Sequence, residues 1–286
     1  MVDTCNGPPP YAKMSYLFIY ITDLNYYMNS ISKAAKVFFD RANDFVYPSL
    51  LQFFLSLAFL LGAIGIYFFI SGLFGVMGIR PGDSYIIILA ILSFIYIVIL
   101  AGLKGAWVKG IIHALEGDRI KLYEYIRYAL SKSLSFFGVV LIKLIVVTIL
   151  FSPIVYLYIN DPSVFSSDVV KVVLTFIYLI IIFFVEYFFY LAFPIIAGYN
   201  VGFMRSIILS FKLSVRHFKD FFIPFFIMGF VFITNFIPLI DILTYLVLYP
   251  IVYSAFIINL ASIEGEISEK DAVEHKKHKK YKGRHR

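Results

Sequence analysis

Two oppositely charged side chains, Lys143 and Glu186, lie inside the apolar runs 134–158 and 169–197 of this 286-residue chain. An ionisable side chain near the centre of a bilayer costs about 2.5 to 3.5 kcal/mol unless it is paired or hydrated. At a helical rise of ~1.5 Å per residue, Lys143 lies ~12 Å from the inner start of its run near Ser135, and Glu186 lies ~16 Å from the inner end of its run near Ala197. The similar depth and opposite charge predict an ion pair between the two helices.

Such a pair has three interpretations. It can lock two helices together without any further role. Alternatively, Lys143 can extend its four-carbon stem along the helix and place its ammonium group among the lipid headgroups. In the third interpretation, both side chains line a path for a small polar solute or a proton. The sequence leaves all three open.

Motifs for other chemistry are missing from the sequence. It contains no phosphate-binding glycine loop, no His-Glu-x-x-His and no Gly-x-Ser-x-Gly. Cys5 has no second cysteine for a disulfide. The histidines lie at or outside the predicted inner membrane boundary, at His113, His217, His275, His278 and His285. We therefore expect no catalytic residue, metal or cofactor. An enzyme would need titratable groups that converge from the connectors, such as Glu116, Asp118 and Glu124.

The composition indicates the elements that carry these residues. Hydrophobic residues make up 61% of the chain and charged residues 15%, whereas roughly 25% of residues in soluble domains are charged. In hydrocarbon, a spanning segment must satisfy its own backbone polar groups and needs ~20 apolar residues as a helix. The sequence therefore predicts an all-α integral membrane protein, with its membrane domain at residues 15–263. The six predicted spans cover residues 50–76, 84–103, 134–158, 169–197, 220–238 and 242–262, and the last two are separated at Pro238.

The basic residues predict the orientation of these spans. Four lie in residues 1–49, six in 104–133, four in 199–219 and eight in 263–286, which is 22 of the 25 in the chain. The opposite side has only Arg80 and Lys171. Because cytoplasmic loops carry the excess of Lys and Arg, we expect a multi-pass protein of the cell membrane with both termini in the cytoplasm.

Residues 199–219 have the pattern of an amphipathic helix at the membrane surface. Apolar residues recur along one stripe, at Met204, Ile208, Phe211, Val215 and Phe218. Basic residues recur along a neighbouring stripe, at Arg205, Lys212, Arg216 and Lys219. We expect these four to contact lipid headgroups. Segments 28–44 and 104–133 show similar patterns, so helices that lie flat are predicted to collar the cytoplasmic face.

The two ends of the chain are predicted to lack structure. Residues 1–14 contain a glycine and three consecutive prolines, and residues 264–286 are too polar to fold. The C-terminal segment is strongly basic and would lie on anionic lipid through Lys276, Lys277, Lys279 and Lys280. We therefore expect anionic lipid headgroups, and a possible protein at the cytoplasmic face, as partners rather than nucleic acid. The oligomeric state is open.

One stretch of the sequence resembles known membrane families. The residues are Phe193-Pro194-Ile195-Ile196-Ala197, Gly202, Ser206, Ser210, Phe211-Lys212-Leu213 and Asp220-Phe221-Phe222. They resemble a recurring stretch of the YciC-like proteins, of the membrane domain fused to some glycerophosphoryl diester phosphodiesterases, and of archaeal families of unknown function. The resemblance would cover residues 33–263 and implies about six helices without an established reaction. No segment resembles the soluble phosphodiesterase domain.

Two functions follow as hypotheses. The first is a non-enzymatic membrane protein that organises lipid or a partner protein at its cytoplasmic face. The alternative is a small-solute transporter or channel that uses Lys143 and Glu186. A polar, water-accessible cavity lined by these two residues would favour transport, and a dry packed bundle would favour the first hypothesis.

Overall fold

The computed structural model describes residues 30–76, 83–161, 167–234 and 244–263. Every regular element in these ranges is a helix, which confirms the all-α class there. The elements are α2 (Ser30–Asp40), α3 (Ala42–Val76), α4 (Asp83–Glu116), α5 (Leu122–Asn160), α6 (Asp168–Tyr190), α7 (Ala192–Tyr199), α8 (Phe203–Arg216), α9 (Phe218–Thr234), the π-helical turn η2 (Thr244–Leu248) and α11 (Tyr249–Ser262). The predictions for residues 1–14 and 264–286, with their terminal lysines, and those for Arg80 and Pro238 lie outside the described residues.

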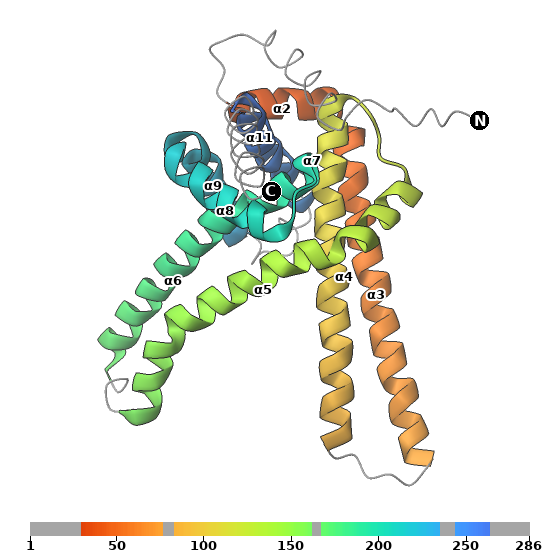
Figure 1. The fold of residues 1–286 in the computed structure, drawn as a ribbon, viewed down its shortest axis with the longest axis vertical. Helices are drawn as coiled ribbons and strands as arrows, with labels where there is room; N and C mark the ends of the chain where they lie inside the picture. The colour runs from red at the N-terminus through yellow and green to blue at the C-terminus, as the bar shows by residue number, and fades with distance from the viewer. Residues whose placement is uncertain (1–29, 77–82, 162–166, 235–243, 264–286) are drawn as a thin grey trace, which may run out of the picture.

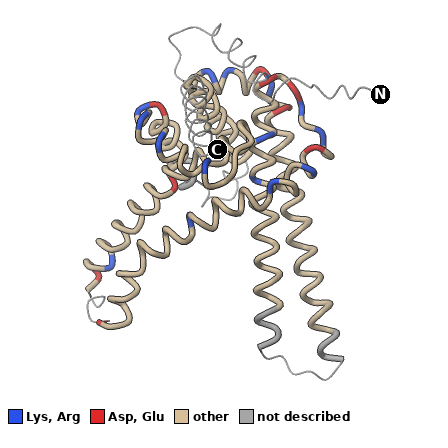
Figure 2. Tube along the Cα trace, in the orientation of Figure 1, with Lys and Arg blue, Asp and Glu red and all other residues tan. Residues whose placement is uncertain are grey.

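Two helical hairpins diverge from a common head (Figure 1). One hairpin is formed by α3 and α4 and the other by α5 and α6, while α2, α7, α8, α9 and α11 gather in the head. Figure 2 shows that charged residues concentrate on the head, and that the hairpin of α3 and α4 is uncharged along its described arms. The fold therefore separates a polar end from two apolar arms.

The arms expose apolar side chains, as Phe68, Phe69 and Ile149 show. Within the described ranges, five helical segments are long and apolar enough to cross a membrane: Ala42–Gly72, Ile88–Glu116, Leu122–Asn160, Asp168–Tyr199 and Thr244–Ser262. None of the most apolar 18-residue window of the first segment is buried inside the molecule. Exposed apolar surface of this extent requires lipid or another protein around it. The arrangement fits a multi-pass membrane protein.

The turn between α4 and α5 is shorter than the sequence predicted. The expected spans 84–103 and 134–158 left a connector of about thirty residues, whereas α4 continues to Glu116 and α5 already begins at Leu122. Gly117 ends α4 with a φ of +88°, and the Asp118 amide donates to the His113 carbonyl at 2.9 Å. This left-handed helix end closes the turn within a few residues. In the described residues, the segment 122–133 is helical but is continuous with α5, so the predicted surface helix is the first part of α5 and not a separate element.

A bend between α6 and α7 returns the chain to the head. Pro194 has no amide hydrogen for the carbonyl of Tyr190, so the helix deviates at Leu191. Beyond the bend, the whole stretch from Ala192 to Ala197 is buried. The fourth predicted span, 169–197, is therefore an exposed arm that ends in a buried helix.

Candidate functional site

Helix α8 exposes its apolar stripe and buries a polar one. The apolar residues predicted from the sequence are each about half exposed: Met204 53%, Ile208 51%, Phe211 52%, Val215 56% and Phe218 44%. In contrast, Ser206, Ser210 and Ser214 are completely buried against the head. A helix in water would present these faces the other way round, so this orientation suits a helix whose outer surroundings are lipid. The predicted basic stripe of Arg205, Lys212, Arg216 and Lys219 is also exposed.

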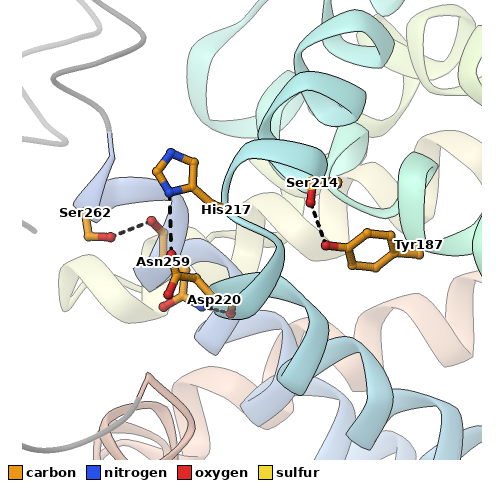
Figure 3. A network of polar contacts seen from close by, with 6 residues as sticks. All are labelled: Tyr187, Ser214, His217, Asp220, Asn259 and Ser262. Carbon is orange, nitrogen blue, oxygen red and sulfur yellow. Dashed lines mark hydrogen bonds and ion pairs between the residues drawn. The ribbon is translucent and has the colours of Figure 1, made fainter.

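Serine side chains allow α8 to lie close to α6. The Ser210 hydroxyl donates to the Phe188 carbonyl at 2.5 Å, and the Ser206 hydroxyl donates to the Phe203 carbonyl at 2.6 Å. Small residues let two helix backbones approach, and these hydrogen bonds satisfy the buried hydroxyls. From the opposite side, the Tyr187 hydroxyl donates to the Ser214 carbonyl at 2.8 Å (Figure 3). The polar face of α8 is thus held against α6 by hydrogen bonds.

The far end of α8 is joined to α11 by a second polar network (Figure 3). Asn259 donates from Nδ2 to the Asp220 carbonyl at 2.5 Å, and the Ser262 hydroxyl donates to the Asn259 carbonyl at 2.7 Å. His217, which ends α8, places Nδ1 at 3.5 Å from Oδ2 of Asp220. The corner between α8 and α9 is therefore anchored to the last helix. This anchor fixes the angle at which α8 crosses the head.

We expect Tyr187→Phe to lower the free energy of unfolding by about 1 kcal/mol, the usual contribution of one hydrogen bond. The Tyr187 hydroxyl is buried in the head and is bonded to α8. Unfolding of the purified protein in detergent micelles, followed by helicity, measures the loss. Tyr178→Phe is the control because Tyr178 is exposed on the same helix and its hydroxyl has no hydrogen bond within the described part of the chain. Equal losses in the two variants would contradict the role of Tyr187.

The structure brings Lys143 and Glu186 together. Nζ of Lys143 lies 2.7 Å from Oε1 of Glu186, and the side chains are 30% and 45% exposed. On α5, burial ends shortly before the pair, since Val139 is buried and Leu144 is exposed. The contact therefore lies where the hairpin of α5 and α6 leaves the head. Its geometry is that of a charge-assisted hydrogen bond.

Lys104 is a third charge in this region, and sequence reasoning missed it. It interacts electrostatically with both Lys143 and Glu186, and its ammonium nitrogen lies 5.4 Å from the centre of the Phe193 ring. The predicted span ended at residue 103, which assigned Lys104 to a surface connector. The apolar residues that continue at helical spacing beyond it, Val108, Ile111 and Ile112, were the signal that α4 goes on. Glu186 therefore forms its ion pair with Lys143, and Lys104 is a more distant, exposed cation that adds to the field around the pair.

An apolar groove lies on the same hairpin but is separate from the ion pair. It has a volume of about 680 Å³ and lies between α5, α6 and α8. Lys212 is its only charged lining residue, and neither Lys143 nor Glu186 lines it. Glu124, one of the titratable groups considered for an enzyme, accepts a hydrogen bond from the backbone amide of Lys121 at the start of α5. Among the described residues, no group of three or more His, Cys, Asp or Glu side chains could hold a metal ion.

Comparisons with known proteins add no function to this geometry. No protein-family model matches the chain, and no curated protein or solved structure matches it either. The resemblance to the YciC-like and phosphodiesterase-linked membrane families therefore stays a prediction.

Proposed function

We propose that this protein is a non-enzymatic, six-span protein of the cell membrane that organises anionic lipid at its cytoplasmic face. The observation that carries the proposal is the orientation of α8, which turns its apolar stripe outward beside four exposed basic residues. An interfacial helix binds through apolar area and through attraction to anionic headgroups. Here the buried serine stripe leaves both features available to lipid.

The four basic residues, three on α8 and Lys219 at the start of α9, give the expected size of the effect. A Lys or Arg near an anionic membrane surface contributes about 1 kcal/mol. Arg205, Lys212, Arg216 and Lys219 together can therefore concentrate anionic lipid strongly beside the protein. Salt weakens the attraction because the charges are exposed. A possible protein partner on the same face would meet the same basic stripe.

Lipid selectivity of the reconstituted full chain tests the proposal. Spin-labelled phosphatidylglycerol and phosphatidylcholine report the fraction of each lipid that the protein immobilises. We expect several-fold selectivity for phosphatidylglycerol, reduced by salt and largely lost when Arg205, Lys212, Arg216 and Lys219 are all replaced by Gln. Lys171→Gln is the control, because Lys171 pairs with Asp168 at the start of α6, at the end of that helix away from α8. A wild-type protein without selectivity would overturn the proposal.

The six-span topology is also part of the proposal. Helix α9 is shorter than the five segments named above, and residues 235–243 lie outside the description. The distribution of Lys and Arg supports a sixth crossing, because it places both termini on the basic side. The only cysteine, Cys5, provides the test.

We expect a membrane-impermeant maleimide to label Cys5 in inverted membrane vesicles and not in intact cells. In a Cys5→Ser background, His285→Cys should behave in the same way, because six spans place both termini on one side. Labelling of the two positions from opposite sides would establish an odd number of crossings and exclude the six-span topology. Ser163→Cys is the control that should be labelled in intact cells, because residue 163 lies between the predicted spans 134–158 and 169–197, on the side opposite the termini.

A second candidate, transport of a small solute or proton, is favoured by the cluster of Lys104, Lys143 and Glu186. Intramembrane charges of this kind often mark a transport path. The apolar groove argues for the first proposal, since the cavity on this hairpin is not lined by the pair. Proton flux into reconstituted vesicles discriminates between the two. We expect no flux above that of protein-free vesicles, and a flux abolished by Glu186→Gln would instead support transport.

A further inference from the structure

The groove between α5, α6 and α8 is partly open and is lined almost entirely by apolar side chains. From α5 it is lined by Ile142, Val146 and Leu150, which recur every four residues. At ~1.5 Å per residue these three span about 12 Å along the helix. Aliphatic and aromatic residues of α6 and α8 complete the walls, among them Ile181, Phe184, Phe188 and Ile208. The lining offers an elongated apolar ligand a continuous surface.

Lys212 is the exception in this lining. It is exposed on α8 and lies at the groove. Within the described part of the chain it has no hydrogen bond or ion pair, whereas Arg205 and Arg216 on the same helix both have interactions. A cation left without a protein partner beside an apolar groove is complementary to a ligand with an anionic head and a hydrocarbon tail.

We propose that this groove binds one anionic phospholipid, with an acyl chain along α5 and α6 and the phosphate on Lys212. The proposal rests on the proposed function and names the site at which lipid is held. The volume of about 680 Å³ lies within the usual range for small-molecule sites, roughly 300 to 1,000 Å³. The interfacial position of α8 places Lys212 beside the headgroups while the arms of α5 and α6 extend into the hydrocarbon.

The chemistry of the site selects this occupant over others. A free phosphate would contact a single exposed cation, Lys212, and would leave the apolar groove unfilled. A neutral lipid would fill the groove and leave Lys212 without a counter-charge. A lipid with both features uses the groove and the cation together, so headgroup and tail each contribute to retention.

Retention of lipid through purification tests the site. The full chain is reconstituted in mixed phosphatidylglycerol and phosphatidylcholine, extracted in mild detergent and examined by native mass spectrometry. We expect one retained phosphatidylglycerol in the wild type and at least a tenfold lower occupancy in Ile181→Trp, which fills the groove. Val172→Trp is the matched control, since Val172 is exposed on the same helix and lies outside the groove. Lys212→Gln should retain lipid without preference between the two headgroups.

A cross-linking measurement on the wild type locates the lipid without relying on any variant. Phosphatidylglycerol with a photoactivatable group in its acyl chain should label the groove residues of α6 and α8 several-fold more than the exposed face of α3 around Phe68. Uniform labelling, or full retention by Ile181→Trp, would overturn the site. Spin-label selectivity that persists in Ile181→Trp would leave the proposed function intact, so the two failures are distinguishable.

Discussion

Glu186→Gln is expected to destabilise the protein more than Lys143→Gln, although the two residues form one ion pair. Removal of Glu186 leaves Lys143 without its ion-pair partner and leaves the like charge of Lys104 acting on it. Removal of Lys143 leaves Glu186 with Lys104 as a remaining counter-charge. An uncompensated charge within a spanning helix costs about 2.5 to 3.5 kcal/mol. We expect Glu186→Gln to approach this loss and Lys143→Gln to fall clearly below it.

Unfolding of single and double variants in micelles measures this asymmetry. In the double variant Lys143→Gln with Glu186→Gln, one uncompensated cation fewer remains, so it should be more stable than Glu186→Gln alone. The same rescue is expected when Lys104→Gln is combined with Glu186→Gln, and the double-mutant cycles give the coupling energies. Asp168→Asn removes the carboxylate of an exposed pair with Lys171 and should change stability by at most about 1 kcal/mol. Equal losses in the two single variants would show that Lys104 does not act as the second cation.

Several features of this site followed from the sequence because they depend on a single property of the chain. The similar depths of Lys143 and Glu186 needed only the helical rise and the limits of two apolar runs. The apolar stripe of α8 needed only its helical periodicity. The direction in which α8 turns that stripe was different, because it depends on what surrounds the helix. In water, α8 would turn its apolar stripe toward the head. With lipid outside, the apolar stripe faces outward, and the opposite face with Ser206, Ser210 and Ser214 packs against the head.

Other features depend on tertiary contacts and were missed for that reason. Hydropathy placed the end of the second span at residue 103, since Lys104 and Lys109 interrupt the apolar run. In the structure, α4 continues to Glu116 because residues beyond Lys104, including Trp107 and Ile111, are buried in the core of the head and do not face lipid. Trp107 donates from Nε1 to the Ser49 hydroxyl at 2.8 Å, a contact 58 positions apart in the chain. No local pattern reveals such a partner.

The crossing of α4 and α5 predicts a large effect from a single methyl group. At Gly102 of α4, an added Cβ would overlap the carbonyl oxygen of Ala129 on α5 and would lie 3.0 Å from Cβ of Ser133. The obstacle is backbone, so neither helix can relieve it by a change of rotamer. Separation of α4 and α5 would also strain the hydrogen bond from the Tyr125 hydroxyl to the Leu103 carbonyl, now 3.0 Å. We expect Gly102→Ala to lower the free energy of unfolding by about 1 to 3 kcal/mol, the usual cost of overpacking.

Gly65→Ala separates this packing effect from helix propensity. Nothing lies within 4 Å of a Cβ at Gly65 on the exposed arm of α3, and alanine favours a helix over glycine by about 1 kcal/mol. Gly65→Ala should therefore leave the midpoint of thermal unfolding unchanged or raise it, while Gly102→Ala lowers it. Both substitutions gain the same intrinsic helix propensity. The difference in stability between the two variants therefore measures the cost of the steric overlap between α4 and α5. A Gly102→Ala protein as stable as Gly65→Ala would mean that the two helices do not approach as closely as their backbones indicate.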